Sequence, residues 1–504
     1  MSGREIDPSF LAAPTRRLAE AALQRCRELG VEHADVRYER NRAEHFSVRD
    51  GRLEGTTDDE DTGLAVRVVH DGTWGFAAGV RLTPEAAVRL AEQAVAVATV
   101  SKPLAAERVE LADEPVHGDV SWISAYDIDP FTVPAADKVA LLSDWSRRLL
   151  ADDRVDHTDA TLMHVQENTF YADLAGTITT QQRIRLAAAV TAVTVDPATG
   201  RFETMRTTAA PVGRGWEWMT VDGYDWDTRL AELPELLAEK VAAPSVEPGL
   251  YDLVIDPTNL WLVIHESVGH ATELDRALGY EAAYAGTTFA TFDQLGTLRY
   301  GSELMTVTGD RTAPHGLASV GWDHEGVAAQ EWDLVSGGVL VGYQLDRAFA
   351  PKLGAARSNG CAYADSAHNV PIQRMANVSL QPDPVVDRST ADLIAGVEDG
   401  LYIVGDRSWS IDMQRYNFQF TGQRFFEIRA GRLVGQLRDV AYQATTTDFW
   451  GSMEAIGGPQ TYALGGAFNC GKGQPGQIAA VSHGCPSAVF RGVRVLNTVA
   501  EAGR

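Results

Sequence analysis

The segment Ala242-Ala-Pro-Ser-Val-Glu-Pro-Gly249 places two prolines and a glycine directly after a helical pattern. Proline cannot continue a helix or the interior of a sheet, so such a run ends regular structure. The chain has 504 residues, which exceeds the roughly 100–200 residues of a typical domain. We therefore predict a boundary at this segment, with one domain at residues 1–243 and a second at residues 250–504.

The first region mixes helical and extended patterns. Helices, marked by apolar side chains that recur on one face, are expected at residues 14–30, 84–100, 134–150 and 230–241. Strands, marked by alternation, are expected at residues 35–48, 64–69 and 73–80 and over much of 158–212. The polar segment 104–120 is expected to be a connector that could divide this region into residues 1–103 and 121–243. The pattern predicts an N-terminal α/β domain with helices on a sheet.

The second region has a different pattern of helical and extended segments. It contains one helical patch at about residues 258–278, and the rest consists of short extended runs separated by glycine and aspartate. Tyr416, Phe418 and Phe420 alternate as in a strand, and Ala430-Gly431 separates two such runs as in a hairpin. We therefore predict a β-rich C-terminal domain that carries a single helix, and an α+β fold class for the whole chain.

Charge and cysteine content limit the kinds of partner and compartment. The chain carries 44 basic and 69 acidic residues, a net charge of −25, whereas a nucleic-acid phosphate backbone requires a basic surface. No apolar run approaches the roughly 18 residues of a membrane span, and the first ten residues do not resemble a signal peptide. Four cysteines do not form a disulfide framework, and Cys26 and Cys361 are assigned to the core. We expect a soluble cytoplasmic protein that binds neither nucleic acid nor membrane.

The sequence His265-Glu266-Ser-Val-Gly269-His270 is the feature most indicative of chemistry. In zinc peptidases with His-Glu-x-x-His, histidines four residues apart share one helix face, and the glutamate activates a water. Here the spacing is five, which on a regular helix separates the histidines by about 140° rather than about 40°. A π-bulge or a helix end would bring them together, and Gly269 is where such a distortion costs least.

Catalytic zinc usually has three protein ligands and one open position, so a third ligand is needed. The candidates are Cys470, Cys485, Glu273 and Asp275. Cys470 is followed by a glycine, which would allow a close approach to a metal, and the nearby Lys472 is expected to favour its thiolate. On spacing alone the choice among the four stays open.

Two further patterns resemble functional motifs only in part. Gly466-x-x-x-x-Gly471-Lys472 resembles a phosphate-binding loop, but Gly473 stands where a serine or threonine must meet magnesium. Asp323-His324-Glu325 has no second histidine at ligand spacing, so we interpret it as a solvated turn. Neither pattern supports a second chemical site.

The metal motif, together with two further segments, resembles the TldD/PmbA family, and within it the TldD branch. The other segments are Arg407-Ser-Trp-Ser-Ile-Asp412 with Arg415-Tyr-Asn-Phe-Gln-Phe420, and Cys470-Gly-Lys-Gly-Gln474. The resemblance covers nearly the whole chain and includes Ala34-Asp-Val-Arg-Tyr38. It implies that His265, His270 and Cys470 bind Zn²⁺ and that Glu266 is catalytic.

The resemblance also implies an activity and partners. Members of the family are zinc-dependent peptidases for short or unfolded peptides, and an older label calls them modulators of DNA gyrase. They form dimers that enclose a chamber, so a homodimer and a heterodimer with a paralogue lacking the metal motif are both expected here. Because the metal motif is intact, this chain resembles the active partner.

We hypothesise that the chain hydrolyses peptides with zinc, and that Glu266 takes a proton from water and passes it to the leaving amine. Arg415, Tyr416 and His483 are candidates for stabilising the oxyanion. Two rival functions share the motif. One is a non-catalytic acidic interaction protein with a structural zinc, and the other is a metal-dependent hydrolase of non-peptide amides.

Overall fold

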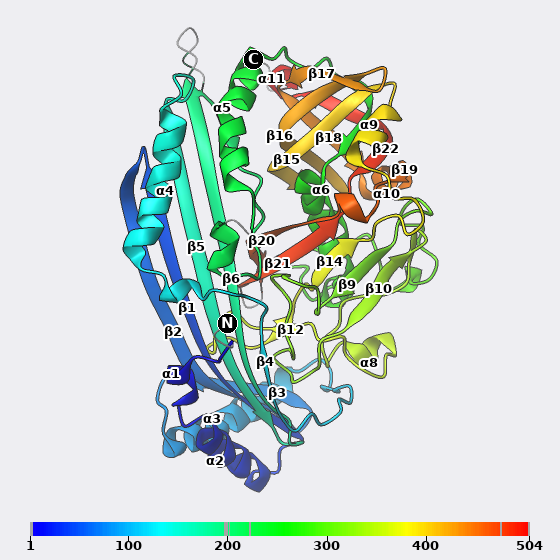
Figure 1. The fold of residues 1–504 in the computed structure, drawn as a ribbon. Helices are drawn as coiled ribbons and strands as arrows, with labels where there is room; N and C mark the ends of the chain where they lie inside the picture. The colour runs from blue at the N-terminus through cyan, green and yellow to red at the C-terminus, as the bar shows by residue number, and fades with distance from the viewer. Residues whose placement is uncertain (1–3, 196–199, 201, 221–222, 474–475, 502–504) are drawn as a thin grey trace.

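The structure of the chain is a computed structural model that describes residues 4–195, 200, 202–220, 223–473 and 476–501. Its N-terminal part is built on one curved sheet of seven strands (Figure 1). The strand order is β3-β2-β1-β5-β6-β4, with β7 paired to β6, and only the β4–β6 pairing is parallel. The strands are β1 His33–Arg49, β2 Arg52–His70, β3 Thr73–Gly79, β4 Asp119–Ile123, β5 His157–Asp173, β6 Ile178–Val195 and β7 Phe202–Arg206.

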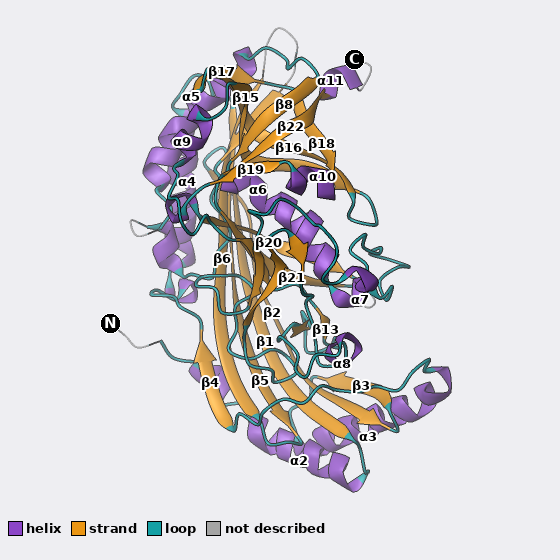
Figure 2. Cartoon of the chain, turned by 90° about the vertical axis from the view of Figure 1, so that its right-hand side faces the viewer, coloured by secondary structure: helices purple, strands orange, loops and turns teal. Residues whose placement is uncertain are grey.

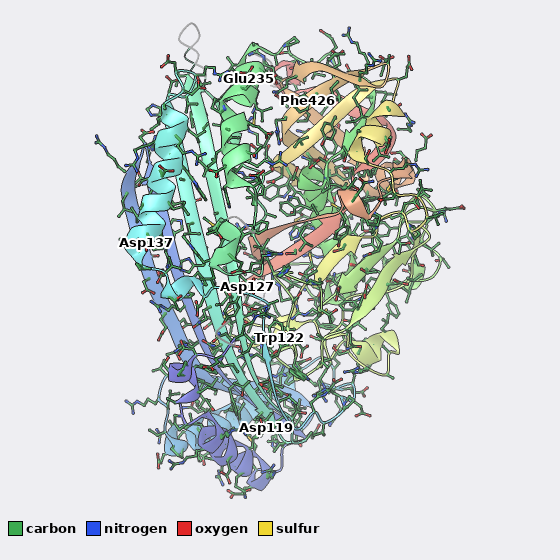
Figure 3. All side chains as sticks on the ribbon, viewed as in Figure 1. Asp119, Trp122, Asp127, Asp137, Glu235 and Phe426 are labelled. Atoms are coloured by element: carbon green, nitrogen blue, oxygen red, sulfur yellow. The ribbon has the colours of Figure 1, made fainter. Side chains whose placement is uncertain are left out.

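Helices cover one face of this sheet (Figure 2). They are α1 Pro8–Leu11, α2 Thr15–Glu28, α3 Pro84–Ser101, α4 Ala135–Leu150 and α5 Trp226–Ala242. Alternate residues of a strand point to opposite faces, so the apolar Val36, Tyr38 and Phe46 of β1 all pack against these helices. The outward faces of the helices are polar, and Asp137 of α4 and Glu235 of α5 lie exposed there (Figure 3).

The predicted helices and strands of this region are confirmed in its described residues, whereas residues 196–199 and 201 of the predicted stretch 158–212 lie outside them. Helix α5 begins at Trp226 rather than at residue 230, and the largest difference in extent is in β2. Strand β2 begins at Arg52, well before the expected residue 64. Residues 52–61 are exposed on both faces and carry no apolar alternation, so the sequence pattern does not mark them as a strand. They become one because the Asp50-Gly51 turn folds them antiparallel onto β1.

The sheet face opposite the helices is charged and receives loops from the C-terminal part of the chain. The interpretation of Asp323-His324-Glu325 as a solvated turn is wrong, because all three residues are at most 4% exposed. Glu325 Oε1 accepts from Arg67 at 2.8 Å, and His324 Nδ1 lies 3.2 Å from Glu39 Oε1. Local sequence cannot show this, since the partners stand more than 250 residues away.

Burial of Glu39 makes the stability of the protein depend on pH. Burial raises the pKa of Glu39 to about 8 from an ordinary value of 4.5, although Arg37 opposes the shift. Because the folded-state pKa is the higher one, the contribution of Glu39 to stability is full below pH 4.5 and is lost as pH rises to about 8. We expect Glu39→Gln, which stays neutral, to gain stability relative to wild type between pH 5 and pH 8.

Thermal unfolding of both proteins at each pH measures this gain. A relative rise in Tm of roughly 2–4 °C is expected, the shift that about 1 kcal/mol produces in domains of 150–250 residues. Glu303→Gln is the matched control, because the Glu303 side chain is 87% exposed. A difference between Glu39→Gln and wild type that stays constant from pH 5 to pH 8 would contradict the prediction.

The C-terminal part contains a second seven-stranded sheet of order β15-β8-β22-β18-β16-β17, with β19 paired to β22. Its strands are β8 Gly249–Ile255, β15 Asp399–Ile411, β16 Asn417–Arg429, β17 Arg432–Leu437, β18 Val440–Thr445, β19 Met453–Ile456 and β22 Ala488–Asn497. Because β15 also pairs with β16, five of these strands close into a ring. The predicted hairpin is confirmed as β16–β17 around Ala430-Gly431.

Smaller sheets complete this part and lie below the ring in the view of Figure 1. Four strands pair in the order β11-β10-β9-β14, and β12–β13 and β20–β21 form two-stranded sheets. Their bounds are β9 Val307–Asp310, β10 Glu331–Ser336, β11 Val339–Leu340, β12 Ala362–Tyr363, β13 Ile372–Gln373, β14 Asn377–Leu380, β20 Ala463–Lys472 and β21 Gln477–Cys485. The remaining helices are α6 Pro257–Ile264, α7 Leu274–Ala277, α8 Ala350–Leu353, α9 Thr390–Ala395, α10 Thr446–Gly451 and α11 Thr498–Glu501.

Helix α6 is anchored in the ring by Asn259, which is 1% exposed. Its amide donates to the carbonyls of Gly405 and Thr421 at 2.9 and 3.0 Å and accepts from the Tyr442 hydroxyl at 2.6 Å.

The predicted α+β class, with a β-rich C-terminal part that carries the motif helix, is confirmed. The proposed domain boundary at residues 242–249 stays a prediction. Within the described part of the chain, every helix is too short or too polar to cross a lipid bilayer.

Candidate metal centre

The motif helix changes its winding at the first histidine. Asp256 caps α6 by accepting from the Thr258 N–H, and the α-helix ends at Ile264. The backbone then forms a π-helical segment, His265–Gly269, followed by a 3₁₀ turn, His270–Thr272. A π turn contains more residues than an α turn, so it brings side chains five positions apart to one face. The helix end and the π segment, expected as alternatives, therefore occur together.

Gly269 is distinguished here by close packing against Met375 rather than by its backbone angles. A Cβ atom at this position would lie 2.6 Å from Met375 Sδ. The φ angle of Gly269 is −54°, which any residue adopts. The expectation that glycine eases a backbone distortion at this position is therefore not supported, and what sets Gly269 apart is the close approach of the Met375 side chain.

Three candidate ligands meet at this segment. Ligand atoms of His265, His270 and Cys470 lie within 4.8 Å of one another, and each residue is at most 5% exposed. Cys470 Sγ is 3.6 Å from His270 Nε2. Cys470 reaches this point from β20, where the pairing register with β21 shifts between Ala467 and Cys470. The group can hold a metal ion, and imidazole and thiolate donors suit a borderline-soft divalent ion.

The other candidate ligands have different partners. Cys485 Sγ lies 3.7 Å from the Pro257 carbonyl and is not part of the cluster. Glu273 Oε2 is 3.0 Å from His270 Nδ1, so it supports a candidate ligand from behind. Asp275 is paired with the ammonium group of Lys472 at 2.7 Å.

The expectation that Lys472 stabilises the Cys470 thiolate is wrong, since its ammonium group is occupied by buried carboxylates. Burial by itself raises the pKa of Cys470, but the charges of His270 and Arg374 outweigh it and hold the pKa below its ordinary value. The electrostatic support for a thiolate therefore comes from His270 and Arg374, which sequence proximity did not indicate. Arg374 also donates to the Cys470 carbonyl.

Glu266 follows the first histidine and lies at the wall of a cavity. Burial raises its pKa, but His265, His270 and Arg415 together hold the pKa below the ordinary value. Arg415 forms an ion pair with the Glu266 carboxylate. It does so from the turn between β15 and β16, where its φ is 61° and Asp412 accepts backbone N–H groups of the same turn.

The remaining oxyanion candidates lie elsewhere. The Tyr416 hydroxyl is 3.3 Å from Thr447 Oγ1 and faces a separate pocket. His483 is not among the residues that line the Glu266 cavity, and it contacts His265 from behind. Of the three candidates, Arg415 alone lines that cavity.

The cavity has a volume of about 830 Å³ and lies between the two halves of the chain. One wall comes from the N-terminal sheet and the segment after it, and most of its residues are small, including Ala187–Ala189 and Thr207–Pro211. The opposite wall carries the three candidate ligands, Glu266 and part of β20. Sequence reasoning missed the N-terminal wall, because small residues in a strand carry no chemical signature.

Two protein-family models and several curated proteins match the chain. The model of the PmbA/TldA metallopeptidase C-terminal domain matches residues 248–497, and that of PmbA/TldA metallopeptidase domain 1 matches residues 34–98. A metalloprotease of Methanothermobacter thermautotrophicus is 28% identical, over 93% of this chain and 96% of that protein. A zinc metalloprotease TldD homolog of Saccharolobus solfataricus is 23% identical, over 94% and 98%.

Solved structures show the same fold. A Thermotoga maritima protein named as a candidate modulator of a DNA gyrase aligns with a TM-score of 0.74 and 15% identity, over 95% of this chain and all of that one. TldE from Thermococcus kodakarensis aligns with a TM-score of 0.66 and 15% identity, over 95% and 99%. The two family models together cover more than half of the sequence, and the chain belongs to the PmbA/TldD family.

Proposed function

We propose that this protein is a zinc-dependent peptidase that hydrolyses short or unfolded peptides. The observation that carries the proposal is the convergence of His265, His270 and Cys470 beside Glu266, at the wall of the 830 Å³ cavity. Three protein ligands leave one position open, as catalytic zinc sites do, whereas structural sites are closed by four. A relative named as a zinc metalloprotease supports this choice of metal.

The proposed chemistry assigns a role to each residue. His265, His270 and Cys470 would hold zinc, which when bound would polarise the scissile carbonyl and lower the pKa of the attacking water. Glu266 would accept the proton of that water and deliver it to the leaving amine. Arg415 would keep the Glu266 carboxylate ionised and oriented towards the cavity.

The cavity supports extended peptides as the substrate class. Its volume is too small for a folded domain, and its N-terminal wall is made largely of small side chains that leave room for varied residues. Strand β20, which carries Cys470, pairs only with β21 among the described strands, so its other edge could accept a peptide as an added strand. Such pairing uses main-chain hydrogen bonds and tolerates many sequences.

We further propose that the protein works as a dimer, either with itself or with a paralogue that lacks the metal motif. This proposal rests on the resemblance to the TldD/PmbA family, whose members form dimers. A non-catalytic protein with structural zinc is not favoured, because among the described residues the cluster offers three ligands and not four.

Removal of the metal tests the proposed activity. We expect a strong chelator to abolish cleavage of unfolded peptides, and about one equivalent of zinc per chain to restore it, while magnesium does not. Thiolate and imidazole ligands discriminate against magnesium, which prefers oxygen ligands. Cleavage of a fluorogenic peptide, followed together with metal content, measures the effect. Full activity in protein shown to be free of metal would contradict the proposal.

A further inference from the structure

His483 lies directly behind one of the candidate metal ligands. Its Nε2 is 2.7 Å from Nδ1 of His265, and its own Nδ1 is 2.8 Å from the Val378 carbonyl oxygen. Both histidines are buried, with His483 completely inaccessible to solvent. Three elements therefore meet in one line of contacts: β14, which holds Val378, β21, which holds His483, and the π segment, which holds His265.

Only one assignment of donors and acceptors fits these two hydrogen bonds. A backbone carbonyl can only accept, so Nδ1 of His483 must carry a proton and donate it to Val378. Neutral imidazole has one N–H, which leaves Nε2 of His483 as an acceptor. His265 Nδ1 must then donate to it, and Nε2 of His265 keeps its lone pair. A doubly protonated His483 would place a buried positive charge with no carboxylate among its hydrogen-bond partners, which is strongly unfavourable.

We infer that His483 is a positioning residue that fixes His265 as the Nδ1–H tautomer and so directs its Nε2 lone pair to the metal. This inference rests on the metal site of the proposed function. His483, which the sequence predicts as one of three oxyanion candidates, therefore acts from the side of His265 opposite to the cluster. The metal itself is not needed to set the tautomer, since the protein imposes it through the Val378 carbonyl.

The two candidate histidine ligands are supported by unlike groups. His270 donates through Nδ1 to the Glu273 carboxylate at 3.0 Å, whereas His265 donates to a neutral ring. The His483 ring stacks on Trp261, and the His265 ring makes edge contacts with His270 and His483. Outer-shell partners of this kind typically contribute 10- to 100-fold in metal affinity.

Zinc affinity of two His483 variants tests the inference, with a chelating dye as competitor for the metal. We expect His483→Leu, which offers no acceptor, to bind zinc about 10- to 100-fold more weakly than wild type. His483→Gln, whose amide oxygen can accept from His265, is expected to keep most of the affinity. His324→Leu is the matched control, because it removes another buried imidazole, 4% exposed, outside the cluster. It should leave the affinity of the folded protein unchanged.

Equal affinity of folded His483→Leu and wild type would overturn the inference, as would an equal loss in the Leu and Gln variants. If His483→Leu does not fold, the nitrogen resonances of histidine in metal-free wild type decide the matter. His265 must then show a protonated Nδ1 and an unprotonated Nε2, and the opposite tautomer refutes the inference. Wild type that binds no zinc would instead refute the proposed function, so the two failures are distinguishable.

Discussion

Replacement of Glu266 by Gln is expected to lower kcat/KM for peptide cleavage by roughly 100- to 10,000-fold, the usual contribution of a general base. Zinc content should stay at about one per chain, because the three candidate ligands are untouched. Gln keeps the size and an acceptor oxygen for Arg415 but cannot take a proton at neutral pH. Peptide cleavage and metal analysis of the same preparations measure the two effects.

The matched control for this change is Glu303→Gln, which removes an exposed carboxylate that is not among the cavity-lining residues. It should leave both cleavage and zinc content unchanged. A Glu266→Gln protein that retains zinc and wild-type cleavage would exclude Glu266 as the base. If neither this variant nor wild type cleaves while both hold zinc, the assay is repeated with a paralogue lacking the motif, which separates a missing partner from a structural metal.

Replacement of Cys470 by Ala is expected to remove most of the bound zinc and, with it, all cleavage. Two imidazoles alone hold zinc less firmly than the three protein ligands of a catalytic site. The loss should exceed the roughly 10- to 100-fold that an outer-shell partner contributes. Metal analysis after dialysis against a weak chelator measures it, and circular dichroism checks the fold.

Cys485→Ala is the matched control, since Cys485 is as deeply buried and was an alternative third ligand from sequence. Its thiol contacts the Pro257 carbonyl, and burial raises the pKa of Cys485 well above its ordinary value. The variant should keep zinc and activity. Zinc loss in Cys485→Ala with retention in Cys470→Ala would reverse the assignment of the third ligand.

The change of helix winding at the metal motif could be predicted from the local sequence. The five-residue spacing of His265 and His270 required a distortion if both were to face one metal, and the π segment His265–Gly269 supplies it. The alternation of Phe418 and Phe420 likewise matched β16. In both cases the relevant geometry extends over a few residues, so the spacing along the chain contains it.

Contacts between distant segments were beyond such reasoning. Lys472 is two residues from Cys470, yet it pairs with Asp275, and His270 and Arg374 support the thiolate instead. Asp323-His324-Glu325 has the sequence of a solvated turn, yet the charged face of the N-terminal sheet covers it. Proximity in sequence is a poor guide to electrostatic partners, because strand pairing decides which way each side chain points.

The sequence by itself determined the donor types, their spacing, the position of Glu266 and the apolar alternation that builds the sheets. These features depend on the 3.6-residue and two-residue periods of local backbone structure. Only the tertiary structure decided which distant side chains contact these groups. Arg415 reaches Glu266 across 149 residues, and His483 reaches His265 across 218. Such contacts follow from how sheets and helices pack, and no local period records that packing.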